Sequence, residues 1–444
     1  MTKRTRTILF IICVILFAVI APLAGFYSQG YRFDFETKKI VQTGAFYFKV
    51  LPKNVEIYLT PLDSKHLTGQ DGKFKKKTSI LAGSALIENL LPKSYEVQIK
   101  KEGYRFWQKN LEIKEKQVTE AKNIILFPEN PKLEILIKNV GDFWFSPDEK
   151  KMVIYESAAA SLPPSGWNLK LYELEKNIKS HLIQEKDIYP KGADLLNLEF
   201  SDDSKEIYLN MGMKEQEKNF VLELNKFPPI LTEQKISPIS ENVITSQSLN
   251  NKIYYLDNSG YVFETDSSPD PFQKGTGLKI NAKPFPVQPE TEYKLRVFQD
   301  YIFLQENKSL YLFDQDSESF EKFFDGISNL KISPDLNKLV FSSKSEIWIL
   351  FLKDSDSPFL YQKGDKVFLT RISEKIDNIF WLNSYYLIFN SGSKIKIAEI
   401  DDRDGISIIE IAEFESPKIF WNKTDKKLYI LSNGNLYSST PLLP

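Results

Sequence analysis

The chain has 444 residues, a length that allows about three domains. Its 58 Lys and Arg nearly balance its 59 Asp and Glu, which excludes the strongly basic surface of a general nucleic-acid binder. A single Cys and two His exclude an internal disulfide and leave few ligands for His- or Cys-based metal and catalytic sites. Aromatic residues make up 13% of the chain and favour strands. We therefore expect a globular protein rich in β-structure.

An uncharged apolar segment lies near the N-terminus, at residues 8–27. As a helix it would be about 30 Å long, the thickness of the hydrocarbon core of a bilayer. Basic residues precede it in a short tail, residues 1–7. The positive-inside rule therefore predicts that this tail is cytoplasmic and that the rest of the chain lies outside the plasma membrane.

A cleaved signal peptide is the alternative interpretation of the same segment. Its apolar core would be shorter, about 7–15 residues, and it would end at a small-residue cleavage site. Pro22 disfavours cleavage after either Ala21 or Ala24. We therefore prefer an uncleaved transmembrane helix at 8–27, followed by a linker at 28–43.

Short alternating segments separated by turn residues occupy positions 44–128. None has a sustained helical period, which predicts a small all-β sandwich. The expected strands are Phe46–Val50, Val55–Leu59, Ser84–Glu88, Tyr95–Lys100, Trp107–Ile113 and Asn123–Phe127.

The order of residues in this sandwich resembles a PEGA domain. The resemblance rests on Gly44, Pro52, Val55-x-Ile57-Tyr58 and Leu90-Leu91-Pro92-x-x-Tyr95-x-Val97-x-Ile99-x-Lys101-x-Gly103-Tyr104. It implies a surface-exposed β-module without enzymatic activity, and it names no ligand. Residues 71–77, which contain four Lys, are expected to form a solvated hairpin tip, with attachment to an anionic polymer or lipid as the alternative.

From about residue 140 the chain repeats an apolar strand, a polar turn and a second apolar strand. A period of about 40–50 residues with several strands per copy is typical of a β-propeller blade. Seven copies predict a seven-bladed propeller at 129–444. The equivalent apolar position recurs every 37 to 55 residues, at Met152, Ile207, Ile253, Ile302, Leu339, Leu387 and Leu428.

The turns, of which Ser333-Pro334-Asp335 is one, resemble those of TolB-like and WD-repeat-like propellers. That resemblance implies a fold and not a function. The seventh copy has only three strands, whereas residues 132–138 form an alternating strand without a partner. We expect this strand to close the ring as the outer strand of the seventh blade, because closure removes an exposed sheet edge. It would place the sandwich beside the seventh blade.

Motifs for chemistry are scarce. The sequence contains no nucleophile elbow, phosphate loop or zinc-protease motif. Asp401-Asp-Arg-Asp-Gly405 resembles half of a calcium loop, but the alternating strand that follows favours an acidic hairpin turn. We therefore expect no catalytic residue, no cofactor and no metal. A propeller that cleaves glycosides or other envelope polymers with two carboxylates stays open as the alternative, since the chain has 59 acidic residues.

Two loops are candidates for binding a partner, since function on such folds usually lies in loops. Ser157–Trp167 ends in Trp167, and the Pro-rich connection Asp266–Glu292 carries Phe272 and Phe285. A surface excursion without function is the other interpretation of both loops.

These features together indicate a membrane-anchored binding or scaffold protein of the cell surface. Its propeller face is expected to take a protein, a peptide or a polysaccharide of the envelope, and no nucleic acid. An envelope enzyme and the sensory ectodomain of a partner kinase are the alternatives, and the oligomeric state stays open.

Overall fold

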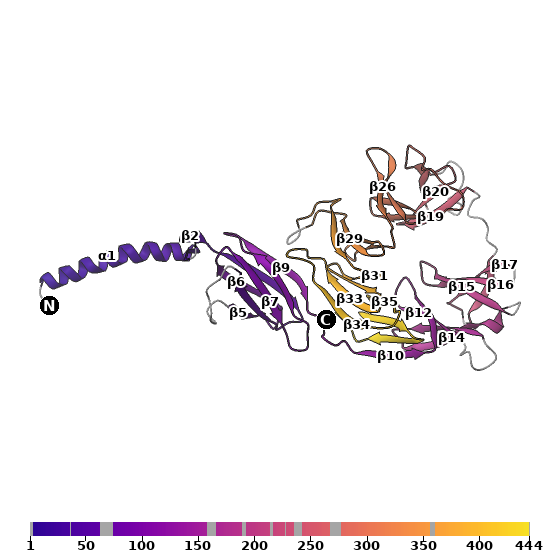
Figure 1. Cartoon of the computed structure of the whole chain (residues 1–444), viewed down its shortest axis with the longest axis horizontal. Helices are drawn as coiled ribbons and strands as arrows, with labels where there is room; N and C mark the ends of the chain where they lie inside the picture. Colours follow the sequence, from indigo (N-terminus) through magenta and orange to yellow (C-terminus); the bar gives the residue numbers. More distant parts are fainter. Residues whose placement is uncertain are drawn as a thin grey trace.

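The computed structural model shows an all-β protein preceded by one helix. Helix, sandwich and propeller follow one another along the long axis of the molecule (Figure 1). The structure describes residues 3–35, 37–62, 74–157, 166–188, 192–213, 216–226, 228–234, 242–266, 277–355 and 360–443.

Helix α1 (Lys3–Ser28) is long and apolar enough to cross a membrane, and its apolar window is not buried against the rest of the protein. A signal sequence near the N-terminus has the same properties. Strands β1 (Tyr31–Asp34) and β2 (Lys39–Gln42) then form a hairpin within the expected linker. Arg32 lies over the ring of Tyr27 and donates to Asn89 Oδ1. The linker is therefore a folded connection between the helix and the sandwich.

Residues 44–128 fold into two sheets, as the alternating pattern predicts. One sheet contains β6 (Ser84–Leu90), β3 (Gly44–Leu51) and β9 (Val118–Ile125), with β3 and β9 parallel. The other contains β5 (Phe74–Lys77), β4 (Glu56–Pro61), β7 (Ser94–Lys100) and β8 (Trp107–Glu112). All four side chains of β5 are exposed. The described part of the lysine-rich segment is thus an edge strand and not a hairpin tip.

Alternate inward-facing residues fill the sandwich, and Phe46, Phe48 and Ile57 are completely buried there. Gly44 lies where the chain passes close to its own backbone. A Cβ at this position would come within 2.5 Å of the Lys114 carbonyl oxygen. A glycine is therefore required at position 44 because no larger residue would fit against this backbone.

Seven four-stranded sheets follow within the described residues, which confirms the seven blades expected from the repeat. The first four blades are β11 (Val140–Phe145), β12 (Lys151–Ser157), β13 (Trp167–Glu173) and β14 (Ile178–Gln184); β15 (Ala193–Phe200), β16 (Glu206–Met213), β17 (Gln216–Glu223) and β18 (Ile230–Gln234); β19 (Val243–Leu249), β20 (Lys252–Asp257), β21 (Val262–Asp266) and β22 (Leu278–Lys279); and β23 (Tyr293–Phe298), β24 (Tyr301–Glu306), β25 (Ser309–Asp314) and β26 (Ser319–Asp325).

The last three blades are β27 (Asn329–Ile332), β28 (Lys338–Ser342), β29 (Glu346–Phe351) and β30 (Lys366–Arg371); β31 (Ile376–Asn383), β32 (Tyr386–Ser391), β33 (Lys394–Glu399) and β34 (Ile408–Glu413); and β35 (Lys418–Asn422), β36 (Lys427–Ser432), β37 (Asn435–Ser439) and β10 (Leu133–Lys138). Strands that open neighbouring blades contact each other, as β27, β31 and β35 do. These first strands are therefore the inner strands of the ring.

The ring closes as the sequence predicts. Strand β10 pairs antiparallel with β37, with Leu133 opposite Ser439 and Ile135 opposite Tyr437. One hydrogen-bonded ladder thus joins the two ends of the propeller and leaves no unpaired edge on this side of β37.

The sandwich contacts the sixth blade directly, whereas the position of residues 132–138 predicts a place beside the seventh. Ile125 and Phe127, at the end of the sandwich, pack against Tyr386 and Ile397 of the sixth blade in a buried cluster that continues into the seventh. The connection from Leu126 to Lys132 explains the difference. Its seven residues can reach about 24 Å, enough to cross from one blade to the next before β10 begins.

Candidate functional site

Trp167, expected to be an exposed partner-binding residue, is buried. It opens β13, and its Nε1 donates to the carbonyl oxygen of Ala193 at 2.7 Å. Its ring belongs to the apolar core shared by the first two blades. The expectation of an exposed tryptophan is therefore wrong, because a large ring with one N–H is more stable in a core that offers it an acceptor. Residues 158–165 of this loop lie outside the described residues.

Phe285 is buried as well, so the prediction that it is exposed for binding a partner is also wrong. It packs edge-on against Tyr293 and Tyr311 of the fourth blade. Gly260 makes room for it, since a Cβ there would lie 2.0 Å from the Phe285 carbonyl oxygen. Within residues 277–292 the Pro-rich connection is therefore anchored by Phe285 in the core shared by the third and fourth blades, while most of its other residues are exposed. Phe272 lies outside the described residues.

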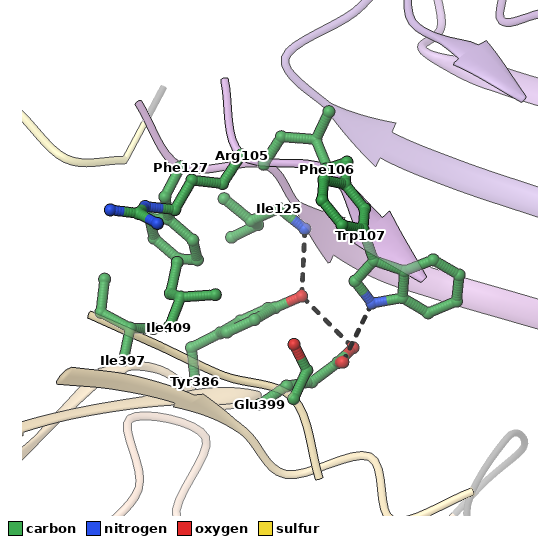
Figure 2. Close-up of a pocket in the computed structure, with 11 residues that line it drawn as sticks. Arg105, Phe106, Trp107, Ile125, Phe127, Tyr386, Ile397, Glu399 and Ile409 are labelled. Carbon is green, nitrogen blue, oxygen red and sulfur yellow. Dashed lines mark hydrogen bonds between the residues drawn. The ribbon is translucent and has the colours of Figure 1, made fainter. Parts of the chain in front are cut away.

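A buried polar cluster forms the junction between the sandwich and the sixth blade. Figure 2 shows Tyr386 and Glu399 on the propeller side facing Trp107 and Ile125 of the sandwich. The Glu399 carboxylate accepts from Trp107 Nε1 at 3.0 Å and from the Tyr386 hydroxyl at 3.3 Å. The same hydroxyl accepts from the backbone N–H of Ile125 at 3.1 Å. Burial raises the pKa of Glu399 to about 7.

Lys109 supplies the cation of this junction. Its side chain is 1% exposed, and its Nζ lies 3.6 Å from Glu399 Oε2. The ammonium also donates to the carbonyl oxygens of Asp401, Arg403 and Gly405. The turn that resembles half of a calcium loop therefore encloses the ammonium group of a lysine from the neighbouring domain.

The polar groups of the junction pair with one another across the two domains. The cavity inside it measures about 20 Å³, room for about one water molecule. Asp401 is neutralised by Arg403, whose Nη2 lies 2.6 Å from Asp401 Oδ2. Within the described ranges, no group of three or more His, Cys, Asp or Glu is placed to hold a metal ion.

A larger cavity, of about 320 Å³, lies among the inner strands β27, β31 and β35. We call it the funnel. Seven of its eleven lining residues are apolar or aromatic, the composition typical of a binding pocket. The lining residues are Glu149, Lys331, Ile332, Ser333, Pro334, Leu336, Phe380, Trp381, Phe420, Trp421 and Lys423.

Two lysines and one glutamate set the charge of the funnel. Lys331 Nζ lies 3.5 Å from the centre of the Phe380 ring, and burial lowers the pKa of Lys331 to about 8. Within the described part of the chain, Lys331 forms no ion pair. Glu149 is already engaged, because it accepts from the backbone N–H of Lys423 at 2.7 Å and lies 3.3 Å from Lys423 Nζ. The lining of the funnel therefore carries one more positive charge than negative charge.

Sequence reasoning missed both clusters, although each leaves a signal. In β8, Lys109 falls in phase with the buried Trp107 and Leu111, so the alternation directs a lysine toward the interior. In the funnel, the tripeptide Ile-Phe-Trp occurs twice at equivalent blade positions, at Ile379–Trp381 and Ile419–Trp421. A repeated aromatic pair on an inner strand marks a shared environment.

Known proteins do not assign this chain to a family. No family model matches the chain, and no curated protein matches it. Among solved structures, the propeller domain of Cps50 (Swd1) from Myceliophteria thermophila is similar, with 11% identity over 70% of this chain and 99% of that chain and a TM-score of 0.41. YCF48 from Cyanidioschyzon merolae has 9% identity over 70% and 98%, with a TM-score of 0.41.

Virginiamycin B lyase from Staphylococcus aureus has 12% identity over 69% of this chain and 98% of that chain, again with a TM-score of 0.41. Likenesses this distant say nothing about what the chain binds. The propeller assignment rests on the seven sheets of the chain itself.

Proposed function

We propose that the chain is a membrane-anchored binding or scaffold protein that presents its propeller funnel to a partner outside the plasma membrane. The observation that carries the proposal is the funnel, an aromatic-walled cavity of about 320 Å³ with a lysine, Lys331, that forms no ion pair among the described residues. Such cavities, with few polar groups fixing orientation in an apolar wall, are the usual form of a binding site. A protein or peptide partner fits this surface better than a polysaccharide, because few side chains here can pair with sugar hydroxyls.

A binding role is favoured over a polymer-cleaving enzyme by the acidic groups of the funnel. Glycoside cleavage ordinarily needs two carboxylates about 5–10 Å apart. The lining contains a single carboxylate, Glu149, which already accepts a hydrogen bond from the backbone N–H of Lys423 and forms an ion pair with its ammonium. We therefore propose a protein without a catalytic site.

The rest of the molecule fits a role in positioning. In the proposal, α1 is an uncleaved anchor with a cytoplasmic N-terminus, and the PEGA-like sandwich acts as a spacer. The buried junction around Lys109 and Glu399 fixes the propeller to that spacer. The funnel is thereby held in one orientation relative to the anchor.

One experiment tests topology and binding together. The only cysteine, Cys13, is replaced by Ser, and a single cysteine is introduced at Leu336 or at Ile178. These two side chains are equally exposed, at 48% and 49%, but Leu336 lines the funnel and Ile178 lies on the outer strand β14. Intact cells are treated with a membrane-impermeant maleimide that carries a photo-crosslinker.

We expect both positions to be labelled on intact cells and only position 336 to yield a discrete crosslinked product. Lack of labelling at both sites would contradict the outside topology. Equal crosslinking from both sites, or none from position 336, would contradict a binding role for the funnel.

A further inference from the structure

Two tryptophans at equivalent positions of the sixth and seventh blades are in different states. Trp381 Nε1 donates to the carbonyl oxygen of Lys331 at 3.0 Å, on the inner strand of the preceding blade. Trp421 is 2% exposed, and its Nε1 has no hydrogen-bond partner within the described residues. A buried N–H without an acceptor is rare in folded proteins and calls for an explanation. Trp421 lines the funnel, so a ligand there is the acceptor we consider.

The second unsatisfied group of the funnel is the ammonium of Lys331. It lies over the ring of Phe380, and among the described residues no carboxylate is within ion-pair distance of it, although Glu149 in the same lining attracts it through space. Glu149 does not fill that role, because its carboxylate is held by Lys423. Lys331 and Trp421 both line the funnel, and they carry a cation and a buried N–H donor that have no acceptor among the described residues. This combination is the electrostatic complement of an anion.

The apolar side chains that line the funnel indicate which chemical group carries the anion. Phe420 is held by a parallel stack on Phe145, with ring centres 4.0 Å apart. Phe380 packs edge-on against Phe420 at 5.2 Å. Ile332, Pro334 and Leu336 complete an apolar surface around these rings. The ligand should therefore carry its negative charge directly beside an apolar group.

We propose that the funnel binds the C-terminal end of a polypeptide, with its terminal carboxylate at Lys331 and Trp421 and the apolar side chain of its last residue against Phe380 and Phe420. This rests on the proposed function and names the ligand class of the same site. A terminal residue such as Leu or Phe carries its carboxylate and its apolar side chain on one carbon atom. An internal Asp or Glu lacks that arrangement, and a uronic acid would surround the carboxylate with hydroxyl groups for which this wall offers few partners.

The test uses the full chain in detergent micelles and fluorescein-labelled random nonapeptides. One pool has a free C-terminal Leu or Phe, and a matched pool has the same residues as C-terminal amides. Binding is measured by fluorescence polarisation. We expect the free-acid pool to bind at least tenfold more tightly than the amide pool.

Two variants probe the groups themselves. Lys331→Met removes the cation and keeps the length of the side chain, and Trp421→Phe removes the N–H and keeps an aromatic ring. We expect each to weaken binding of the free-acid pool, about tenfold for Lys331→Met and several-fold for Trp421→Phe. Lys366→Met and Trp348→Phe are the controls, since Lys366 lies over Phe323 and Trp348 donates to Glu346, both away from the funnel. These controls should bind as the wild type does.

Equal binding of acid and amide pools would overturn the proposal, as would unchanged binding by Lys331→Met and Trp421→Phe. Displacement of the peptides by oligogalacturonate at equal concentration would overturn the choice of a polypeptide. Absence of peptide binding would also overturn it, and crosslinking from position 336 would then still support the proposed function. Failure of both experiments would reject the proposed function itself.

Discussion

The junction and the funnel contain the same kinds of side chain in opposite states. At the junction, the ammonium of Lys109 meets three carbonyl oxygens and a carboxylate, and the N–H of Trp107 donates to Glu399. In the funnel, the ammonium of Lys331 faces an aromatic ring, and the N–H of Trp421 has no acceptor among the described residues.

The difference separates a structural role from a binding role. A buried polar group that has all its partners stabilises one arrangement of the chain, and it has no capacity left for a ligand. A group that folding leaves without a partner lowers stability, but a ligand that supplies the partner gains the interaction. The pairing state, and not the residue type, therefore distinguishes the two sites.

The largest effect is expected when the junction loses its cation. Lys109→Met leaves Glu399 and three carbonyl oxygens without their shared donor. Breaking a buried pair in this way costs on the order of 3–5 kcal/mol. The midpoint of urea denaturation of the full chain in detergent should fall accordingly.

Lys375→Met is the matched control for the loss of a lysine. Its ammonium pairs with Asp377 at the surface, and such exposed pairs contribute about 0–1 kcal/mol. If Lys109→Met and Lys375→Met lower the midpoint equally, the buried contacts of Lys109 do not stabilise the folded chain more than an exposed ion pair does.

The pH dependence of stability is the next largest effect. The carboxyl of Glu399 has a pKa of about 7 in the folded protein against 4.5 as its ordinary value. Between these two values the folded chain holds a proton that the unfolded chain has lost, so raising the pH favours unfolding. This one group should remove about 3 kcal/mol of stability as the pH rises from 4.5 to 7, with little change below or above that window.

Glu399→Gln should therefore make the dependence of unfolding free energy on pH less steep between pH 4.5 and 7. Urea denaturation at several pH values measures it. Glu374→Gln is the control, because hydrogen bonding by Ser391 lowers the pKa of Glu374, so its contribution to stability is lost as the pH falls below 4.5 and the substitution should leave the slope between pH 4.5 and 7 unchanged. A slope unaffected by Glu399→Gln would contradict a buried carboxyl with a raised pKa.

The smallest effects come from the two equivalent tryptophans. Trp381→Phe removes a hydrogen bond between the fifth and sixth blades and should cost about 1 kcal/mol for that bond, in addition to the smaller ring. Trp421→Phe removes a donor that has no partner in the described structure and should cost less, through the ring alone. Thermal unfolding of the two variants gives the comparison. A larger loss for Trp421→Phe would show that its N–H has an acceptor in the unliganded protein.

Much of the architecture is readable from the sequence because it depends on local periodicity. Alternation of period two predicted six of the seven strands of the sandwich, but it missed β5 and placed the start of β9 at Asn123 and not at Val118. The recurring apolar positions predicted the seven blades. The closing strand was also predictable, since residues 132–138 alternate and the last blade lacks one strand. Each strand signal is contained within a few residues, and the number of blades and the missing last strand follow from comparing such segments along the chain.

The residues predicted to bind a partner were not predictable in the same way. Whether a side chain is exposed depends on segments that are distant in the sequence. Trp167 and Phe285 stand next to proline-rich loops, which suggests solvent exposure, yet each ring finds a core between two blades. Composition around a residue says little about whether another strand will cover it.

The sequence by itself determined the apolar helix, the all-β class, the number of blades and the order of the strands, since hydrophobic periodicity acts between near neighbours. Only the tertiary structure decided which polar groups find partners. Lys109 meets the carbonyl oxygens of residues almost 300 positions away, whereas Trp421 does not repeat the hydrogen bond of Trp381. Pairing of buried charges and N–H groups depends on atoms brought together by the closing of the ring and the docking of two domains, and no local pattern encodes those distances.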